Sequence, residues 1–175
     1  GRVDSVSSVN GRTALHLACL MGHEDYARGL VGAGADLFAV DGEGRTCLML
    51  CAQNGHTGLV KYLYDVGGKR LLLKGDKEGA SCTHDPATNG HIETLRMLLD
   101  LGGKELALWT GKNGRTSAQL ATVGENVEAL RMLLDLGGKE LALKVDHQGA
   151  SCAYFASFHG RLEALRMLLD VGGKE

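Results

Sequence analysis

Cysteine and histidine are the residues of this sequence whose chemistry could support metal binding or nucleophilic catalysis. Two of the five cysteines, Cys47 and Cys51, are four residues apart, so a helix would place both thiols on one side. A structural zinc ion needs four ligands, and no second close pair of cysteine or histidine completes the set. We therefore predict no metal site in this chain.

The number and spacing of the cysteines also bear on the cellular compartment. Five is an odd number, and the residues are scattered from Cys19 to Cys152. Small secreted domains have a dense and even set of cysteines instead. We expect small buried thiols in a protein of a reducing, intracellular compartment, either cytoplasmic or nuclear.

Glycine-rich segments invite a search for nucleotide sites. The segment Gly102-Gly103-Lys104-Glu105 lacks the Lys-Ser or Lys-Thr pair of a phosphate-binding loop. The glycines at positions 29, 32 and 34 lack the preceding strand and the downstream carboxylate of a dinucleotide site. A hydrolase or metal-dependent enzyme remains a minor hypothesis, and we expect no enzymatic activity and no cofactor.

The composition is that of an ordinary globular protein, with 44% hydrophobic residues and 23% charged residues among 175. The formal net charge is −2, so there is no excess of basic residues to neutralise nucleic-acid phosphates. The longest apolar runs, such as residues 71–73, are far shorter than the roughly 20 residues of a membrane-spanning helix. We expect one continuous core, and no binding to nucleic acid or membrane.

Internal repetition is the strongest pattern in the chain. A fixed period of about 20 to 50 residues is typical of repeat proteins, so it decides the predicted fold. The triplet that begins at Gly11 recurs at offsets of 33, 35, 35 and 35 residues, which defines five units. The segment 95–105 recurs at 130–140 and at 165–175 with Val171 as the single change. Such near-identity indicates recent internal duplication.

Each unit is predicted to fold as two short helices joined by a tight turn. In the first unit, Thr13 is suited to cap a helix and Gly22 to end it. In the third unit, Leu95, Leu98 and Leu99 recur at helical spacing and mark one buried face. A pair of helices this short cannot bury its apolar face alone, so the pairs are expected to stack into a solenoid.

The start of each first helix resembles the Thr-Pro-Leu-His signature of the ankyrin repeat family. The corresponding segments read Thr-Ala-Leu-His at 13–16, Thr-Cys-Leu-Met at 46–49, Ser-Cys-Thr-His at 81–84, Thr-Ser-Ala-Gln at 116–119 and Ser-Cys-Ala-Tyr at 151–154. The proline of the signature is missing each time. The resemblance covers nearly the whole chain and implies an all-α solenoid of stacked helix-turn-helix repeats with hairpin-like finger loops.

This register divides the chain into a tail and five repeats. We expect an N-terminal tail at 1–7, repeat 1 at 8–40, repeat 2 at 41–75, repeat 3 at 76–110, repeat 4 at 111–145 and a truncated repeat 5 at 146–175. Repeats 2 to 4 carry two residues more than the usual 33, which predicts a longer and partly apolar outer loop after the second helix.

Two further departures predict local irregularities. Pro86 lies inside the first helix of repeat 3 and lacks a backbone donor, so this helix should be kinked or shortened. In repeat 4, Glu125-Asn126 replaces the Gly-His pair of the turn between the helices. Gly124 could take this turn with a shifted register.

The C-terminal unit shows no polar cap. Leu165, Leu168 and Leu169 repeat the apolar pattern of the interior units, whereas stable solenoids place polar faces on their terminal repeats. We expect further repeats or another chain to pack against this end, and the chain to be a segment of a longer protein.

Positions that vary between units at exposed slots are free to serve a ligand, and the ankyrin family typically uses such positions on its concave side. At the finger turns these are Arg12, Glu43, Arg45, Lys77, Glu78, Lys112, Asn113, Arg115, His147 and Gln148; at the helix ends they are Leu20, Met21, Gln53, Asn54, Thr88, Asn89, Phe158 and His159; the lone Trp109 is added as an exposed aromatic.

The resemblance and these residues together predict a scaffold that binds a partner protein through its concave face. The alternative is a regulatory ankyrin segment attached to a larger enzyme or channel.

Overall fold

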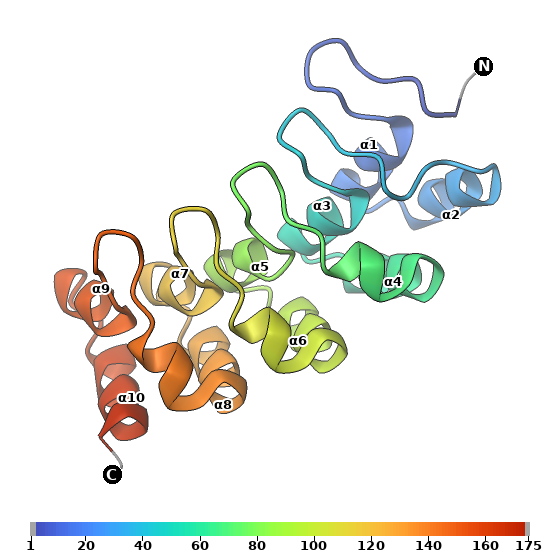
Figure 1. The fold of residues 1–175 in the computed structure, drawn as a ribbon. Coiled ribbons are helices and arrows are strands. Elements are labelled where there is room, and N and C mark those ends of the chain that lie inside the picture. The colour runs from blue at the N-terminus through green and yellow to red at the C-terminus, as the bar shows by residue number, and fades with distance from the viewer. Residues whose placement is uncertain (1–2, 174–175) are drawn as a thin grey trace.

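A computed structural model describes residues 3–173 of the chain. Within that range there are ten helices and no strand, which confirms the all-α prediction (Figure 1). They are α1 (Ala14–Met21), α2 (Glu24–Gly32), α3 (Cys47–Gln53), α4 (Thr57–Leu72), α5 (His84–Asn89), α6 (Ile92–Ala107), α7 (Ser117–Val123), α8 (Val127–Leu143), α9 (Cys152–Phe158) and α10 (Leu162–Gly172).

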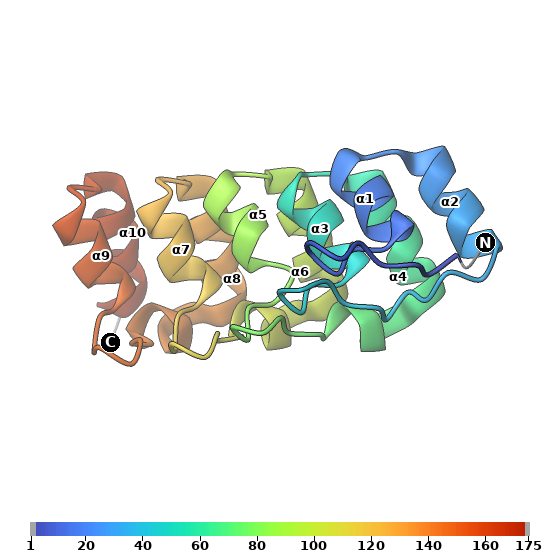
Figure 2. The same ribbon diagram turned by 90° about the horizontal axis from the view of Figure 1, so that it is seen from above.

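The helices are stacked as a two-layer solenoid. Each odd-numbered helix packs on the next odd-numbered one, and each even-numbered helix on the next even-numbered one. Figure 2 shows the pairs following one another along the molecule from the N-terminus to the C-terminus. The predicted stacking of helix-turn-helix units is therefore confirmed.

Hydroxyl side chains start most of the odd-numbered helices, as the sequence predicted. Thr13, Thr46, Thr116 and Ser151 each accept a hydrogen bond from the backbone N–H three residues later. This bond satisfies one of the four N–H groups that have no partner inside the helix.

Leucines from the even-numbered helices form the core between repeats. Leu63, Leu98 and Leu133, which recur at one slot of the repeat, have no exposed surface. Fully burying one leucine contributes about 1.5–3 kcal/mol, so this row is a main source of stability. The repeated Leu-Arg-Met-Leu-Leu segment is thus part of the scaffold.

The two extra residues of repeats 2 to 4 do not lengthen a loop, so that prediction was wrong. Gly68, Gly103 and Gly138 interrupt α4, α6 and α8 with φ between 56° and 63°, and a further helical turn follows each of them. Side chains of these turns, such as Leu106 and Leu141, are completely buried. Glycine is needed at the break because other residues rarely adopt positive φ. The apolar residues of the insertion therefore extend the core.

Pro86 shortens α5, as expected. The helix begins at His84 and has six residues, whereas α3 begins at Cys47, two residues earlier in its repeat. The proline therefore occupies the third helical position, where no N–H partner is required. The three preceding residues form a turn in which the His84 N–H donates to the Ser81 carbonyl at 3.1 Å.

The turn between α7 and α8 keeps its register, which corrects the prediction for Gly124. Gly124 has a right-handed φ of −72°, and Glu125 takes the left-handed conformation with φ of 61°. In the described chain, Glu125 is the one residue other than glycine with positive φ. Gly124 has a different role, because a Cβ there would lie 2.5 Å from the Thr88 carbonyl oxygen.

The C-terminal face of the last repeat exposes apolar side chains. Phe158, Leu162 and Leu169 are between 59% and 72% exposed, while Leu168 is 4% exposed on the core side. The structure therefore shows no polar cap over this face of residues 146–173.

A buried polar side chain links neighbouring repeats at one slot of the odd-numbered helices. In α1 and α5 this slot holds His16 and His84, whose Nε2 bonds the carbonyl oxygen of Arg45 or Arg115 in the next repeat. In α7 it holds Gln119, whose Nε2 donates to the Ala150 carbonyl at 2.7 Å. In all three cases the other end of the side chain accepts the backbone N–H of the residue three positions earlier, which is Thr13, Ser81 or Thr116.

Replacing Glu125 tests the cost of the left-handed turn. Glu125→Gly should be more stable than Glu125→Ala by about 1 kcal/mol, because glycine adopts positive φ without the clash of a Cβ. Both variants lose the same exposed ion pair with Arg161, so their difference isolates the backbone term. Urea unfolding followed by circular dichroism measures it, and equal stabilities would refute the interpretation.

The two buried histidines should make stability depend on pH. Burial lowers the pKa of His16 and of His84 below the ordinary 6.5. Below pH 6.5 the unfolded chain therefore binds protons that the folded chain does not, and stability falls as the pH drops from 6.5 toward the lowered values.

Glutamine is the matched control, because Gln119 makes both hydrogen bonds of this slot without titrating. The double variant His16→Gln/His84→Gln should match the wild type near pH 7.5 and become relatively more stable below pH 6.5. The gain is at most about 1.4 kcal/mol per pH unit for each histidine. Parallel curves of unfolding free energy against pH would contradict this.

Candidate partner-binding surface

Five finger loops project along one edge of the solenoid, beside the odd-numbered helices (Figure 1). We call the surface formed by these fingers and the odd-numbered helices the inner face. The fingers are closed by backbone hydrogen bonds, and their residues are 7–12, 41–45, 76–80, 111–115 and 146–150. Three of them also end in an isolated β-bridge, which gives them the hairpin character that the sequence predicted.

Each finger is bonded to the next one through the backbone. The N–H groups of Gly42, Lys77, Lys112 and His147 donate to carbonyl oxygens of the preceding finger at 2.7–2.9 Å. The row is therefore a continuous hydrogen-bonded array, so side chains at its tips are held at regular intervals. An ordered surface loses less conformational entropy when a partner binds.

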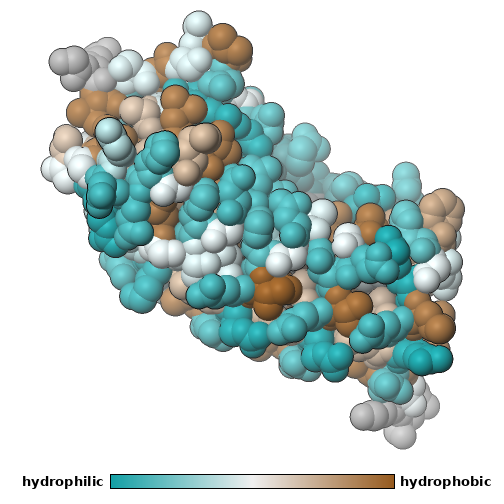
Figure 3. Space-filling model, turned by 180° about the vertical axis from the view of Figure 1, so that it is seen from behind, coloured by the Kyte–Doolittle hydropathy of each residue, from teal (hydrophilic) through white to brown (hydrophobic). Residues whose placement is uncertain are grey.

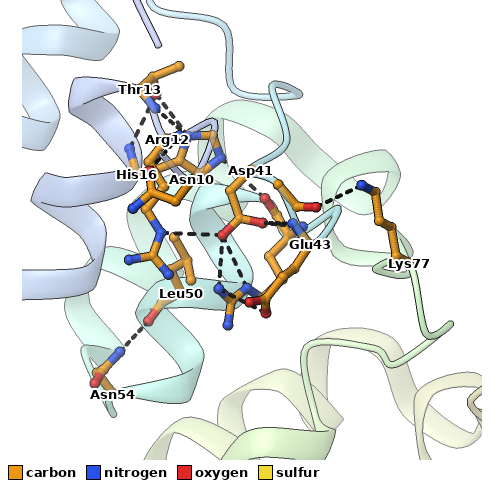
Figure 4. A network of polar contacts seen from close by, with 11 residues as sticks. Asn10, Arg12, Thr13, His16, Asp41, Glu43, Leu50, Asn54 and Lys77 are labelled. Atoms are coloured by element: carbon orange, nitrogen blue, oxygen red, sulfur yellow. Dashed lines mark hydrogen bonds and ion pairs between the residues drawn. The ribbon is translucent and has the colours of Figure 1, made fainter. Parts of the chain in front are cut away.

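Charged side chains brace the first two fingers (Figure 4). The Asp41 carboxylate is buried and contacts the guanidinium groups of Arg12 at 3.4 Å and Arg45 at 3.0 Å. Arg45 also contacts Glu43 at 3.1 Å, and the Lys77 ammonium group donates to the Gly42 carbonyl at 2.7 Å. These interactions tie the fingers of repeats 1, 2 and 3 together.

Hydrogen bonds keep the carboxylates of Asp41 and Asp146 charged. Burial alone would raise the pKa of Asp41, but backbone and side-chain hydrogen bonds from Arg45 and the backbone N–H of Glu43 outweigh it and lower that pKa. The pKa of Asp146 is also lowered, first by the backbone hydrogen bond from Ala150. Both aspartates are therefore acceptors that shape their fingers at neutral pH.

The arginine–aspartate bracing is interrupted in the middle of the array. Repeat 3 has Ala80 at the slot of Arg45. Arg45 of the preceding finger contacts Asp41 and Glu43 instead of Asp76. Asp76 accepts hydrogen bonds from its own finger, at the Glu78 and Ala80 N–H groups, and forms no ion pair within residues 3–173. Bracing resumes where Arg115 contacts Asp146 at 3.4 Å.

The structure places the predicted partner-binding residues in two classes. Exposed are Met21, Glu43, Asn54, Lys77, Glu78, Asn89, Lys112, Asn113, His147, Gln148, Phe158 and His159, whereas Arg12, Leu20, Arg45, Gln53, Thr88, Trp109 and Arg115 are partly buried. The first class has surface that a ligand could contact, although Glu43, Asn54, Lys77 and Asn89 also bond to other residues of the chain. The second class already contributes to packing or bracing.

Trp109 was predicted to be an exposed aromatic residue, but it is partly buried. Its indole N–H donates to the Gly79 carbonyl at 2.7 Å, and its ring packs against the core. The side chains of Asn54 and Asn89 are exposed but donate to the carbonyls of Leu50 and Gln53. These three residues therefore hold loops and helix ends in place.

Aromatic rings gather at the C-terminal end of the inner face. Phe158 stacks on Tyr154 with centroids 6.2 Å apart and meets His159 edge-on at 5.0 Å. Tyr154 contacts Phe155, and the Arg115 guanidinium lies over the Phe155 ring at 5.0 Å. Sequence reasoning selected Phe158 and His159 but missed Tyr154 and Phe155, although their adjacency in the sequence was a usable signal.

Sequence reasoning also missed Asp85, which lies on α5 between the fingers of repeats 2 and 3. The equivalent slot is occupied by leucine or phenylalanine in the other repeats, at Leu17, Leu50, Leu120 and Phe155. Burial raises the pKa of Asp85 although the Arg45 guanidinium opposes the shift, and the carboxylates of Asp76 and Glu43 add to it. Comparison of slots across the repeats would have found this residue.

The opposite side of the molecule, seen from behind, is mostly hydrophilic (Figure 3). Hydrophobic residues gather on that side at the N-terminal end. In the first helix pair, Leu17, Met21 and Tyr26 are 46–75% exposed. This gathering continues around the first helix pair, lined by Ala14, Leu17, Met21, Tyr26 and Leu30.

The cysteines have environments that suppress their chemistry. All five are buried and free, and burial raises the pKa of Cys82 and of Cys152 to about 12. A protonated thiol is neither a good nucleophile nor a metal ligand. Within residues 3–173, no cluster of three His, Cys, Asp or Glu side chains could hold a metal ion, and no helix is long and apolar enough to span a membrane.

Asparagine substitutions at two equivalent finger positions should measure the bracing. Asp41→Asn should lower the free energy of unfolding by about 1–2 kcal/mol more than Asp76→Asn, because Asp41 alone loses ion pairs with two arginines. Both variants keep an oxygen acceptor for the finger N–H groups. Equal losses in urea unfolding at pH 7 would show that the ion pairs add nothing.

Models of known protein families match most of the chain. A model described as ankyrin repeat matches residues 10–42, one described as ankyrin repeats (3 copies) matches 30–107, and one described as ankyrin repeats (many copies) matches 121–169.

Curated proteins match over shorter segments. Tyrosine-protein kinase HTK16 of Hydra vulgaris is 35% identical over 65 residues, which is 37% of this chain and 9% of that protein. Human transient receptor potential cation channel subfamily A member 1 is 35% identical over 71 residues, 39% of this chain and 6% of that protein. Target of rapamycin complex 2 subunit AVO2 of Saccharomyces cerevisiae is 36% identical over 58 residues, 33% of this chain and 14% of that protein.

The matched segments are thus a small part of each of these relatives. The family models agree with the observed stack of helix pairs and fingers, and together these findings show that the chain belongs to the ankyrin repeat family.

Proposed function

We propose that this ankyrin repeat chain binds a partner protein along its inner face. Ankyrin repeats generally mediate protein–protein interactions. The observation that supports the inner face is its rigid row of fingers, in which backbone bonds fix the spacing of exposed side chains that differ from repeat to repeat. Exposed side chains that differ between repeats, on a backbone whose spacing is fixed, can form a surface that is complementary to one partner.

Four exposed residues are the best candidates for direct contacts. Glu78, Lys112, His147 and Phe158 lie on the inner face, and no hydrogen bond or ion pair between side chains occupies them within residues 3–173. Their chemistry covers both charges and one aromatic ring. Aromatic residues in the centre of interfaces are frequent anchors of binding.

The alternative is that the chain regulates a larger enzyme or channel of which it is one segment. It is supported by the similar segments in a tyrosine-protein kinase and in a cation channel. The exposed apolar face of α9 and α10, with Phe158, Leu162 and Leu169, also favours contact with a further repeat or another chain there. The open reading frame of the gene separates the two functions.

The free thiols of all five cysteines support an intracellular location in either case, cytoplasmic or nuclear. Disulfides form and persist in oxidising compartments, whereas the cysteines of this chain are free thiols.

Affinity capture from the native cell, with mass spectrometry, tests the inner face. The variant Glu78→Ala/Lys112→Ala/His147→Ala/Phe158→Ala should lose at least 90% of a partner captured by the wild type, because it removes exposed contacts. Its melting temperature should change by only about 3 °C, since exposed substitutions away from special features have small effects on stability.

A matched variant on the even-numbered helices is the control. Glu93→Ala/Asp100→Ala/Arg131→Ala/Asp135→Ala also removes four exposed side chains, from α6 and α8. It should capture the partner as the wild type does. Capture that survives the inner-face changes, or that disappears with the control changes, would contradict the proposal.

A further inference from the structure

We propose that a cleft between the helix-connecting turns of repeats 4 and 5 binds a neutral primary carboxamide group. The cleft has a volume of about 260 Å³ and lies between the α7–α8 turn and the α9–α10 turn. These turns follow the odd-numbered helices, whereas the fingers precede them. The inference therefore concerns a site outside the finger row, and it is independent of the inner-face proposal.

At two earlier interfaces, a side chain of the later repeat fills the corresponding place. A Cβ at Gly22 would lie 2.5 Å from the His56 ring, and a Cβ at Gly90 would lie 2.7 Å from the Asn126 side chain. The two side chains therefore pack directly on the glycines of the preceding turns. Each of them also donates a hydrogen bond to a carbonyl near the end of the preceding odd-numbered helix.

The interface of repeats 4 and 5 differs at both of these positions. Glu125 replaces the glycine of repeat 4, and Arg161 replaces the histidine of the first three turns. Arg161 contacts the Glu125 carboxylate at 2.6 Å. Within residues 3–173, no side chain donates to the Val123 carbonyl, the counterpart of the Thr88 carbonyl that Asn126 bonds. The cleft lies at this departure, and both of its walls belong to the described residues.

Arg161 brings to this cleft a donor that has no acceptor. Its Nε is the one buried side-chain nitrogen or oxygen of residues 3–173 that forms no hydrogen bond. A buried donor without a partner is unfavourable. A ligand oxygen that accepts this N–H therefore gains a bond without displacing an existing one. The carbonyl oxygen of a carboxamide fills this role.

The charged groups of the cleft favour a neutral ligand. Arg161 is the one cationic residue that lines it, and Glu125 already forms an ion pair with it. Glu163 also lines the cleft and is exposed. Arg131 and Arg166 line an adjoining groove with Glu163, but neither forms an ion pair with it within residues 3–173. Two carboxylates therefore face one arginine, and a carboxylate ligand is disfavoured by repulsion.

A primary carboxamide matches these groups on both of its sides. Its oxygen accepts the Arg161 N–H, while its NH2 group can donate to the carboxylates of Glu125 and Glu163. Val127 and Leu162 also line the cleft and supply apolar contacts for the body that carries the group. That body can be a partner's glutamine or asparagine side chain, or a small molecule.

Three small molecules of nearly equal size test the chemistry. Benzamide, benzoate and acetophenone have the same ring and carbonyl, but carry NH2, O⁻ or CH3 beside it. Titration of the ¹⁵N-labelled whole chain, followed by NMR, measures each affinity. Benzamide should bind at least about fivefold more tightly than the other two, which is the contribution of one hydrogen bond, and should shift the Arg161 Nε–H signal.

A blocked glutamine, N-acetylglutamine methylamide, distinguishes the two sources. Shifts of the same signals by both compounds would support a partner's side chain as the ligand, and shifts by benzamide alone would support a small molecule. Tighter binding of benzoate, or equal affinities for the three ring compounds, would overturn the inference.

Substitutions at the turn separate binding from folding. Arg161→Lys keeps the positive charge but has no N–H at the position of Nε, so it should weaken benzamide at least about fivefold. Glu125→Gly/Arg161→His restores the regular Gly–His arrangement, so it should abolish binding without lowering the melting temperature. Arg131→Lys is the matched control in the adjoining groove and should change the affinity less than twofold.

Circular dichroism verifies that the three variants are folded. Benzamide binding that survives both changes at Arg161, or that weakens equally in Arg131→Lys, would contradict the assigned site. Loss of binding in the stable double variant would support it, because that chain keeps the fold and lacks only the altered turn.

Discussion

Burial of the leucine face between successive helix pairs is the constraint on which the rest of this structure depends. A single pair has too little apolar contact to be stable, so each repeat is completed by its neighbour. Leu63, Leu98 and Leu133 have no exposed surface in the interior repeats, whereas the equivalent Leu30 of the first repeat is only partly buried. This requirement fixes the spacing of the repeats, and the fingers inherit the spacing through their backbone bonds. The geometry of the inner face is thus a consequence of the core.

The same constraint explains what the sequence could predict. Repetition of the leucine pattern and of the capping hydroxyls reveals which residues face the core and where helices begin, since both depend on local spacing. The architecture, the finger loops and the shortened α5 at Pro86 followed from that pattern. Positions such as Lys112 and Phe158 were selected as binding candidates because they vary between repeats where the core residues do not, and their role stays a prediction.

What could not be predicted depends on contacts between residues far apart in the chain. The insertion of repeats 2 to 4 was expected to form a loop, yet Leu106 and Leu141 have room in the core once a left-handed glycine turns the chain back. Trp109 was expected to be exposed, but the Gly79 carbonyl of the preceding finger offers its N–H a partner. Glu125 adopts positive φ because the tertiary packing of α7 and α8 imposes the turn that glycine makes elsewhere.

Departures from the repeat pattern are therefore more informative about recognition than the pattern itself. Where arginine and aspartate both recur, as at Asp41, the charges satisfy one another and serve the scaffold. Where a slot changes character, as at Asp85, burial disfavours the charged form of the side chain and raises its pKa. The exposed side chains of the fingers also differ from repeat to repeat, as at Glu43, Glu78 and Lys112. The surface of the fingers therefore varies along the solenoid, although the core beneath it is nearly identical.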